Sequence, residues 1–564
     1  MPRKLFAVAV LALVLSPTAA SRPVEVMPDV TYDRILQWTP AGPVSMYVIT
    51  GPRPGGLYSL NVLLSNGAIT GRETVSAMER DVSSRLTTIG VNGDFFNWKG
   101  GWPSGLLMQN GILEHHPADN RGAVGIDSSG ALHVDHVSMS ALWRAPDATS
   151  YPISELNEPP RPNATALFTP IWGQSIPAVK GVAVVLEPFP ALTPFKDLVG
   201  TVTSVVNDTP VAIPRDGAVL VARGDEGAIL QAEAAVGAQI GVRFALRSDW
   251  ASVLDAVSAG PTLVKNGRPI ADAHEALTPV QLRGRDPRTA IGQRADGTIV
   301  MVAVDGRQPR WSIGITNWDL ALALVRYGCV NGFALDSGGS TTVAFDGRLL
   351  NRPSDRTGER PVAEALVIGY AGVFAPSPAP TLSPNGDGRG DRERLSYKLV
   401  RRSSVTASLI APDGSARVLD ATQRTPGWYP VTWNGTDPSG AAAAEGRYRW
   451  TVTATDDLGR TSTATRSFTL DKTLGFVRVS RNARTISFTL TRDARIRVTL
   501  ETTYADILRT IAAGPRHAGT VRVRWNGRDG RGKRVRSGSY VVRVAATSAI
   551  GLSELRVPVR IRRR

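Results

Sequence analysis

The chain has 564 residues, of which 42% are hydrophobic and 20% are charged, so it is long enough for three or four packed domains. This composition is that of ordinary globular protein and excludes an intrinsically disordered chain. The chain has a single cysteine, Cys329, which excludes an internal disulfide. Each domain must therefore be stabilised by its packed core. The formal net charge is +16.

The first twenty residues predict a secretion signal. Arg3 and Lys4 precede an apolar run from Leu5 to Leu15, and the small residues up to Ala20 suit cleavage. The run is well short of the roughly 20 residues that span a bilayer, and no later segment is long and apolar enough to do so. We therefore expect a signal peptide at residues 1–20 and a secreted or cell-wall associated protein with no transmembrane segment after cleavage.

Residues 30–372 are expected to form a strand-rich α+β domain. Four Asn-Gly or Asp-Gly pairs with apolar-rich flanks predict β-hairpins, in LLMQNGILEH, TLVKNGRPI, IGQRADGTIVMVAVDG and TVAFDGRLL. The clearest helix is TNWDLALALVRYG, where Thr316 and Asp319 fit a capping box and Gly328 suits the left-handed position that ends a helix.

Polar residues follow apolar runs at four places in this domain. They are Asn92 with Asp94, Gly260 with Pro261, the segment from Asp286 through Arg288 to Asp305, and the segment from Asp336 to Thr341. Strand ends that carry a carboxylate or an arginine beside glycine are typical of sites where the backbone approaches a ligand closely. Four of them in one domain are better evidence for a site than any one alone.

The segment DSGGS, residues 336–340, allows three interpretations. A serine-protease nucleophile turn would need a histidine base, and none of the six histidines lies in such a motif. An anion-binding loop is favoured, because Gly338 and Gly339 let successive N–H groups face a concavity, with hydroxyls added by Ser340 and Thr341. The third interpretation stays open: Asp336 caps the following turn, and Arg288 pairs with Asp286 or Asp305.

The composition changes after the first domain. Four prolines between Pro376 and Pro384 mark a linker at residues 373–384. Beyond it, Trp433, Asn434 and Tyr448 recur 92 residues later as Trp525, Asn526 and Tyr540. This repeat predicts two β-sandwich modules, at residues 385–472 and 474–564, with the Trp and Tyr side chains in their cores.

The start of the first module contains three oxygen-bearing side chains, Asn385, Asp387 and Asp391. They could bind calcium, but their spacing is not that of an EF-hand loop, and a plain Asx turn is favoured. We predict no cofactor and leave only a divalent cation such as Ca²⁺ open.

The second module is strongly basic. Residues 474–564 contain 21 basic and 5 acidic residues, so their net charge of +16 equals that of the whole chain. Outside the cell, such a surface suits an anionic cell-wall polymer, acidic polysaccharide or membrane head groups more readily than nucleic acid. A solvated basic face without a partner is an equally good interpretation.

Several ordered motifs of the first domain resemble the phosphodiester glycosidase family. They are NGDFFNW, SAGPTLVKNG, DPRTAIGQRADGTIVMVAVDGRQ with GITNWDLALALV, and NGFALDSGGSTTVAFDG with NRPSD. The resemblance covers roughly residues 80–370 and implies cleavage of an α-glycosyl phosphodiester into a sugar and a phosphomonoester. The two modules, in turn, resemble the Ig-like domains of the flagellar hook-capping protein, here called FlgD-like.

The resemblance also implies roles for individual residues. Asp336 would be the main catalytic carboxylate, Arg288 and the Ser340 loop would hold phosphate, and Asp94 and Asp305 would hold sugar hydroxyls or assist proton transfer. Asn92, Gly338, Gly339 and Thr341 would help to bind substrate. Ser337 departs from the family, which has glycine there; if that position needs positive φ, the serine costs on the order of 1 kcal/mol.

We therefore expect an exported glycosidase that acts on GlcNAc-like α-glycosyl phosphodiesters in cell-envelope or extracellular glycans. The alternative is a non-catalytic binding protein, with the first domain as a lectin and the basic module attached to an anionic wall polymer.

Overall fold

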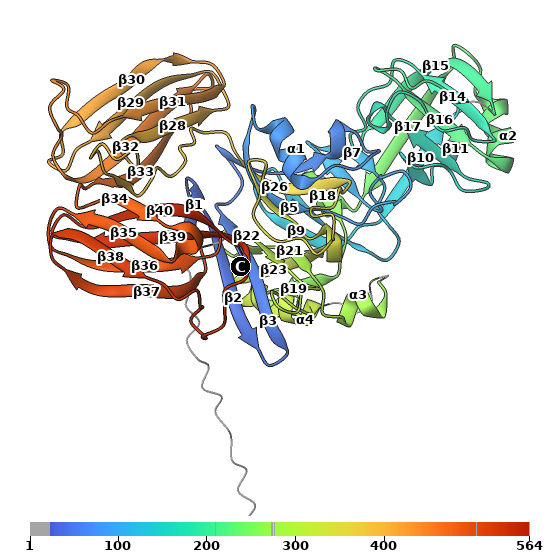
Figure 1. Ribbon diagram of the computed structural model, residues 1–564. Coiled ribbons are helices and arrows are strands. Elements are labelled where there is room, and N and C mark those ends of the chain that lie inside the picture. The colour runs from blue at the N-terminus through green and yellow to red at the C-terminus, as the bar shows by residue number, and fades with distance from the viewer. Residues whose placement is uncertain (1–22, 209, 272–274, 276, 504, 563–564) are drawn as a thin grey trace, which may run out of the picture. The chain divides into compact units, whose positions relative to one another are not determined.

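The computed structural model describes residues 23–208, 210–271, 275, 277–503 and 505–562. The predicted signal peptide at residues 1–20 lies outside them. The chain divides into two compact units, with unit 1 ending at Tyr370 and unit 2 beginning at Ala371. Strands dominate both units (Figure 1). The expected multidomain architecture is thus confirmed as mostly β, whereas the α+β description of the first domain is not.

Two sheets of unit 1 position the candidate site. The first runs in the order β1 (Val24–Met27), β2 (Val30–Thr39), β3 (Gly42–Gly51), β22 (Ile299–Val304), β21 (Arg288–Arg294), β23 (Cys329–Leu335), β19 (Thr262–Lys265) and β20 (Arg268–Pro269). The second runs in the order β25 (Arg348–Leu349), β24 (Val343–Phe345), β5 (Thr87–Asn92), β26 (Glu364–Tyr370) and β4 (Tyr58–Leu64). Every residue of β5, β22 and β26 is buried, which explains the almost continuous apolar sequences of β22 and β26.

The other two sheets of unit 1 share a hydrophobic core around Trp143 and Trp250. One runs in the order β7 (Ile112–His115), β6 (Leu107–Gln109), β18 (Val253–Ser258), β8 (Gly122–Asp127) and β9 (Leu132–His136). The other runs in the order β11 (Ser150–Pro152), β10 (Met139–Arg144), β17 (Gln239–Leu246), β15 (Asp197–Asn207), β14 (Val182–Leu186), β16 (Ala218–Ala222), β13 (Thr165–Phe168) and β12 (Glu155–Leu156).

The described α-helices are α1 (Val75–Val82), α2 (Gly224–Glu233), α3 (Pro279–Arg283) and α4 (Asn317–Arg326). The prediction for α4 is confirmed: Thr316 and Asp319 form the capping box, and Gly328 has a φ of 82°. None of the described helices combines the length and the apolar character that a membrane crossing requires.

The four predicted hairpins are also confirmed. The strand pairs β6–β7, β19–β20, β21–β22 and β24–β25 are antiparallel. At three of the turns, both central residues have positive φ, as at Asn110 (51°) and Gly111 (79°). These turns fit the type I′ geometry that matches the twist of the flanking strands.

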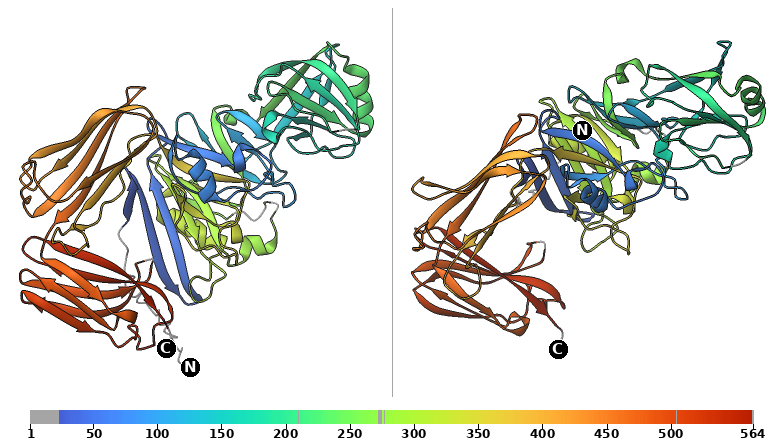
Figure 2. Two further views of the ribbon diagram at one scale, coloured as in Figure 1. Left: turned by 45° about the horizontal axis from the view of Figure 1, so that its top comes forward. Right: turned by 90° about the horizontal axis from the view of Figure 1, so that it is seen from above.

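Unit 2 consists of two β-sandwich modules in tandem (Figure 2). The sheets of the first are β27 (Thr381–Leu382), β33 (Thr461–Leu470), β32 (Gly446–Asp456), β29 (Ser403–Ile410) and β30 (Ala416–Arg424), facing β28 (Glu393–Leu399) and β31 (Gly427–Trp433). Those of the second are β34 (Leu474–Val479), β35 (Thr485–Leu490) and β38 (Gly519–Arg524), facing β37 (Ile507–Arg516), β36 (Ala494–Glu501), β39 (Gly538–Thr547) and β40 (Leu552–Ile561).

The sequence repeat has a structural counterpart. Trp433 and Trp525 are both buried, and each indole N–H donates to the carbonyl three residues later, at 2.8 and 2.9 Å. Likewise, the hydroxyls of Tyr448 and Tyr540 each donate to the carbonyl four residues earlier, at 2.9 and 3.0 Å. The repeated aromatic residues therefore fix the same turns in both modules, as expected for core residues.

The oxygen-rich segment after the linker forms a turn held by backbone donors. Asp391 accepts the N–H groups of Asn385, Gly386 and Gly388, and Asp387 Oδ1 accepts that of Arg389. The carboxylates thus cap the turn, which is the Asx arrangement that the sequence favours.

Candidate active site

Three strand ends meet where the first two sheets of unit 1 approach each other. Asp94 follows β5, Asp336 follows β23 and Glu364 begins β26. The strands β5 and β26 are antiparallel neighbours, whereas β23 belongs to the other sheet. Two hydrogen bonds join the end of β23 to the end of β5. Asp336 N–H donates to Gly93 O at 2.9 Å, and Asn92 Nδ2 donates to Asp336 O at 2.9 Å. Three carboxyl groups are thereby brought into one region of the fold.

The three carboxyl groups are buried, and burial raises the pKa of each. Burial raises the pKa of Asp336 to about 7, and the nearby charge of Asp94 adds to the effect. Burial raises the pKa of Asp94 to about 6. The pKa of Glu364 lies well above its usual range, because of burial first and then of Asp94 and Asp336. A group of like charges held this close cannot all ionise near neutral pH.

The loop after Asp336 supports its carboxylate. Oδ1 accepts the N–H of Ser337 at 2.7 Å, and the Ser340 side chain also hydrogen-bonds to the carboxylate. Gly338 has a φ of 68°, in the left-handed region, whereas Ser337 is extended with a φ of −119°. Serine therefore carries no backbone penalty at position 337, and the cost considered for this departure from the family does not arise.

Two arginines lie beside the carboxyl groups. Arg121 Nη1 is 3.6 Å from Asp94 Oδ1, which lowers the pKa of that carboxyl against the effect of burial. Arg360 donates to both oxygens of Asp355, at 2.8 and 3.0 Å, and to Ser340 Oγ at 3.4 Å. Arg360 thus connects the Asp336 loop to the neighbouring surface.

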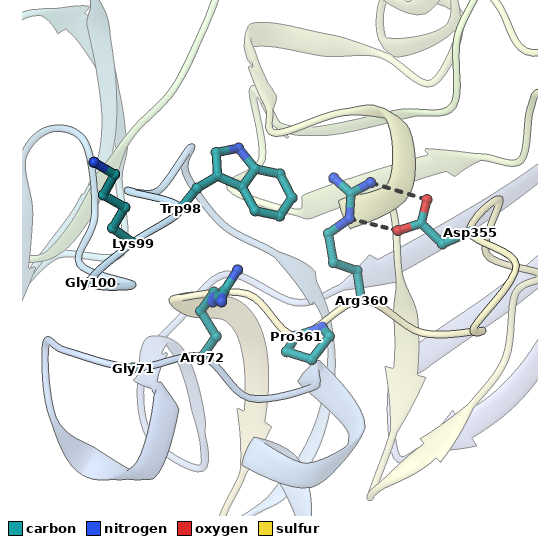
Figure 3. Close-up of a pocket in the computed structure, with 8 residues that line it drawn as sticks. All are labelled: Gly71, Arg72, Trp98, Lys99, Gly100, Asp355, Arg360 and Pro361. Carbon is teal, nitrogen blue, oxygen red and sulfur yellow. Dashed lines mark hydrogen bonds and ion pairs between the residues drawn. The ribbon is translucent and has the colours of Figure 1, made fainter.

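A cavity of about 500 Å³ opens at Arg360. It is lined by Gly71, Arg72, Trp98, Lys99, Gly100, Asp355, Arg360 and Pro361 (Figure 3). The guanidinium carbons of Arg72 and Arg360 lie 5.6 and 5.2 Å from the centre of the Trp98 ring, which is 62% exposed. The cavity therefore combines positive charge with an exposed aromatic face, which suits a ligand that is both anionic and carbohydrate-like.

The other predicted site residues have different surroundings. Asp305 accepts hydrogen bonds from Tyr47 and Trp311, both at 2.7 Å, and from Asn351 Nδ2 at 3.1 Å. Arg288 donates to the carbonyls of Gly284, at 2.7 Å, and Ile315, at 3.4 Å. Both side chains are buried and hold loops in place.

Asn92 and Thr341 take part in hydrogen bonds that hold the loop after Asp336. Asn92 Oδ1 accepts from Thr289 Oγ1 at 2.8 Å and from the N–H of Thr342 at 3.2 Å. The hydroxyl of Thr341 is 3.3 Å from that of Thr289. Gly339 packs against Arg360 and Asp355, and a Cβ at this position would lie 1.9 Å from Arg360 Nη2. These residues therefore determine the course of the loop that carries Asp336.

Sequence reasoning missed Glu364, Arg121 and Arg360. The signal for Glu364 was its place in VAEALVIGY, where one acidic residue opens an otherwise apolar strand. The two arginines lie in irregular segments, and no periodic pattern marks them.

Comparison with known families identifies both parts of the chain. Residues 197–369 match the family model described as phosphodiester glycosidase. Residues 394–457 and 478–549 match the FlgD Ig-like domain. Asp336 and Glu364 lie within the matched residues of the first model, and Asn92 and Asp94 precede them.

Curated relatives match only short parts of the chain. The SPbeta prophage-derived uncharacterized protein YomE of Bacillus subtilis is 43% identical over 111 residues, which are 20% of this chain and 17% of that protein. The N-acetylglucosamine-1-phosphodiester alpha-N-acetylglucosaminidase of Bos taurus is 40% identical over 68 residues, 12% of either chain. The alignments thus span well under two thirds of each relative.

A solved structure shares the fold more widely. A hypothetical protein from Synechocystis superposes with a TM-score of 0.52 and 23% identity, covering 61% of this chain and 62% of that one. This likeness concerns the fold alone.

Proposed function

We propose that this protein, which carries a phosphodiester glycosidase domain and two FlgD Ig-like domains, is a hydrolase that cleaves α-glycosyl phosphodiesters. The observation that carries the proposal is the group of three buried carboxyls, Asp94, Asp336 and Glu364, close to a cavity with a cationic wall. Glycoside hydrolysis needs carboxyl groups in two protonation states, one that donates a proton and one that acts as base or nucleophile.

In this proposal, Asp336 acts in its ionised form on the sugar carbon or on the attacking water. Glu364 keeps its proton, and its Oε2, which has no hydrogen-bond partner among the described residues, is available to donate it. Asp94, whose charge acts on both of these groups, contacts sugar hydroxyls or passes the proton on. Asp305 and Arg288 support the site through the loops that they hold, in place of direct contact with phosphate.

The cavity supplies binding for the leaving group. Phosphate is anionic, so Arg72, Lys99 and Arg360 are the cations that would hold it, and Trp98 offers a face on which a sugar ring stacks. These cations would stabilise the charge of the departing phosphomonoester, beside the proton donation assigned to Glu364. The loop from Gly338 to Thr341 is joined to this cavity by the hydrogen bond from Arg360 to Ser340.

We further propose that the substrate is a GlcNAc-like α-glycosyl phosphodiester of a cell-envelope or extracellular glycan, and that the protein is exported. The expected signal at residues 1–20 and the two Ig-like modules support this location.

The experiment is an assay of the purified full chain on an α-GlcNAc-1-phosphodiester, in which release of sugar and of phosphomonoester is measured together. We expect equal release of both products and loss of activity in Asp336→Asn. The proposal is overturned if the wild-type chain releases neither product, or if Asp336→Asn turns over at the wild-type rate.

A second candidate function, attachment to an anionic wall polymer, is favoured by the surface of the second module. Arginines on its strands are exposed, among them Arg495, Arg497, Arg522, Arg524 and Arg560. Binding of the full chain to purified cell walls should fall as salt rises, because exposed charges are screened. Replacing Arg495, Arg522 and Arg524 by Gln should weaken it, whereas Arg447→Gln with Arg449→Gln, exposed in the first module, should not. Salt-insensitive binding would contradict this candidate.

A further inference from the structure

Three side chains that the proposed reaction does not use form a cluster at the end of β7. The ligand atoms of His115, His116 and Glu158 all lie within 4.8 Å of one another. Nε2 of His116 is 3.0 Å from Glu158 Oε2, and Nε2 of His115 is 3.7 Å from the same oxygen. Two imidazole nitrogens thus face one carboxylate.

Hydrogen bonds of both Nδ1 atoms on the far side of the rings leave the two Nε2 atoms facing the carboxylate. Nδ1 of His115 lies 2.9 Å from Gly105 O, and Nδ1 of His116 lies 3.0 Å from Pro117 O. A carbonyl oxygen only accepts, so each Nδ1 carries a hydrogen, and Nε2 of His115 is left as the acceptor in the neutral ring. Nε2 of His116 shares a hydrogen with Glu158 Oε2 at 3.0 Å, and a bound cation would displace that proton and take the lone pair. Metal-binding histidines have this arrangement, in which one nitrogen donates to the protein and the other bears the lone pair.

His115 adds an independent sign of a missing partner. Its side chain is fully buried, and among the described residues its Nε2 has no hydrogen-bond partner. Buried polar atoms are almost always paired, because an unpaired one costs about 1–3 kcal/mol. Here the unpaired atom is directed at a carboxylate oxygen, and a cation between the two would satisfy both.

The backbone is bent so that neighbouring residues face the same way. Successive side chains of a strand normally point to opposite faces. The rings of His115 and His116 instead stack, with centroids 4.4 Å apart and planes at 21°. Strand β7 ends at His115, and Pro117 follows His116, so the chain leaves the strand between the two rings.

We propose that His115, His116 and Glu158 bind a divalent transition-metal ion, with Zn²⁺ as the best fit. Two imidazole nitrogens and a carboxylate oxygen are ligands that zinc takes, whereas Ca²⁺ and Mg²⁺ prefer oxygen ligands throughout. Three protein ligands leave a fourth position, and the Glu158 side chain, 35% exposed, lies where water can reach it.

A metal ion bound here would stabilise residues 102–105, which lie beside the candidate active site. The Trp102 side chain hydrogen-bonds to Glu158, and Gly105 O accepts from His115. The segment between them returns to Asp94: Ser104 N–H donates to Phe95 O at 2.9 Å, and a Cβ on Gly105 would lie 3.2 Å from Asp94 Oδ2. The ion thus has a positioning role for residues 102–105, separate from the chemistry.

The test is metal analysis of the purified full chain after loading with Zn²⁺ and dialysis against metal-free buffer. We expect about one zinc per chain, a higher melting temperature with zinc than without it, and visible absorption when Co²⁺ replaces zinc. In Glu158→Gln, which keeps the size and the exposed position of the side chain, zinc affinity should fall tenfold or more.

The matched control is His133→Asn, which removes a histidine that pairs with the single carboxylate of Asp127 at 2.9 Å. This variant should bind zinc as the wild type does. The proposal is overturned if the wild-type chain holds no more zinc than a metal-free blank, or if Glu158→Gln binds zinc with unchanged affinity. Because zinc content and melting temperature are measured without substrate, the result does not depend on the proposed activity.

Discussion

The backbone N–H of Asp94 donates a hydrogen bond of 2.5 Å to Oε1 of Glu364. The two residues lie at the adjoining ends of the neighbouring strands β5 and β26, in whose register Asn92 pairs with Ala365. The hydrogen bond fixes Glu364 against the backbone that carries Asp94, while Asp336 is fixed to Gly93 from the other sheet. The charge of Asp94 so placed raises the pKa of both Asp336 and Glu364.

Glu364→Gln should remove activity while preserving the fold. Glutamine matches the shape of the protonated carboxyl and still accepts the Asp94 N–H, but it cannot transfer a proton. We expect kcat to fall by about 10²–10⁴, the usual contribution of a general acid. The control is Glu393→Gln in unit 2, another buried glutamate whose pKa burial raises to about 7; it should keep wild-type kcat. Undiminished turnover by Glu364→Gln would exclude proton donation by this residue.

The activity should depend on pH through Asp336. Burial raises the pKa of Asp336 to about 7, and Arg360 opposes that rise. Because the ionised form is the active one in our proposal, kcat/KM should rise with pH and level off above about pH 7. In Arg360→Gln, this limb of the pH profile should move to higher pH. Arg247→Gln, which removes exposed ion pairs to Asp135 and Asp249, should leave the profile in place. A profile that falls between pH 5 and pH 8 would contradict the assignment.

Asp336→Asn should stabilise unit 1 at neutral and alkaline pH. The pKa of Asp336 is about 7 in the folded state against its ordinary value of 3.8, so between these values the folded state binds more protons and stability falls as pH rises. Removing the charge should therefore raise the free energy of unfolding by roughly 1–4 kcal/mol at pH 8, and much less near pH 4.

Denaturant unfolding of both chains at the two pH values measures this difference. Asp296→Asn should instead lower the free energy of unfolding at pH 8, because Asp296 accepts the Thr298 N–H at 2.9 Å and its pKa is lowered by that bond. If Asp336→Asn were less stable than the wild type at pH 8, the carboxylate would be stabilising and its raised pKa would be refuted.

Local features of the fold were predictable from the sequence because they depend on neighbouring residues. The turn at Asn110 and Gly111 and the cap formed by Thr316 and Asp319 are set by a few adjacent side chains. The site depends on pairing between distant strands. That Asp94 would meet Glu364 follows only from the register of β5 against β26, which no local pattern reveals.

The surroundings of Asp305 and Arg288 could not be predicted either, because they also depend on residues that are distant in the sequence. Asp305 follows β22 as Asp336 follows β23, and Arg288 begins β21. The sequence does not show that Tyr47, Trp311 and Asn351 supply the donors to Asp305. A carboxylate at a strand end can face a ligand or hold a loop, and only its tertiary partners distinguish the two.

Gly338 and Ser337 should respond differently to substitution. Gly338→Ala forces a Cβ at a φ of 68° and 2.8 Å from Arg307 Nη2, so we expect a loss of about 1–2 kcal/mol in stability and a lower kcat/KM as the loop shifts. Ser337→Gly restores the residue that the family has, but Ser337 is already extended. This change should therefore relieve no strain and should leave kcat/KM unchanged, while added freedom of the unfolded chain costs up to about 1 kcal/mol. Urea unfolding and steady-state kinetics on both variants decide the point: a gain of stability in Ser337→Gly would mean that the loop adopts positive φ at residue 337.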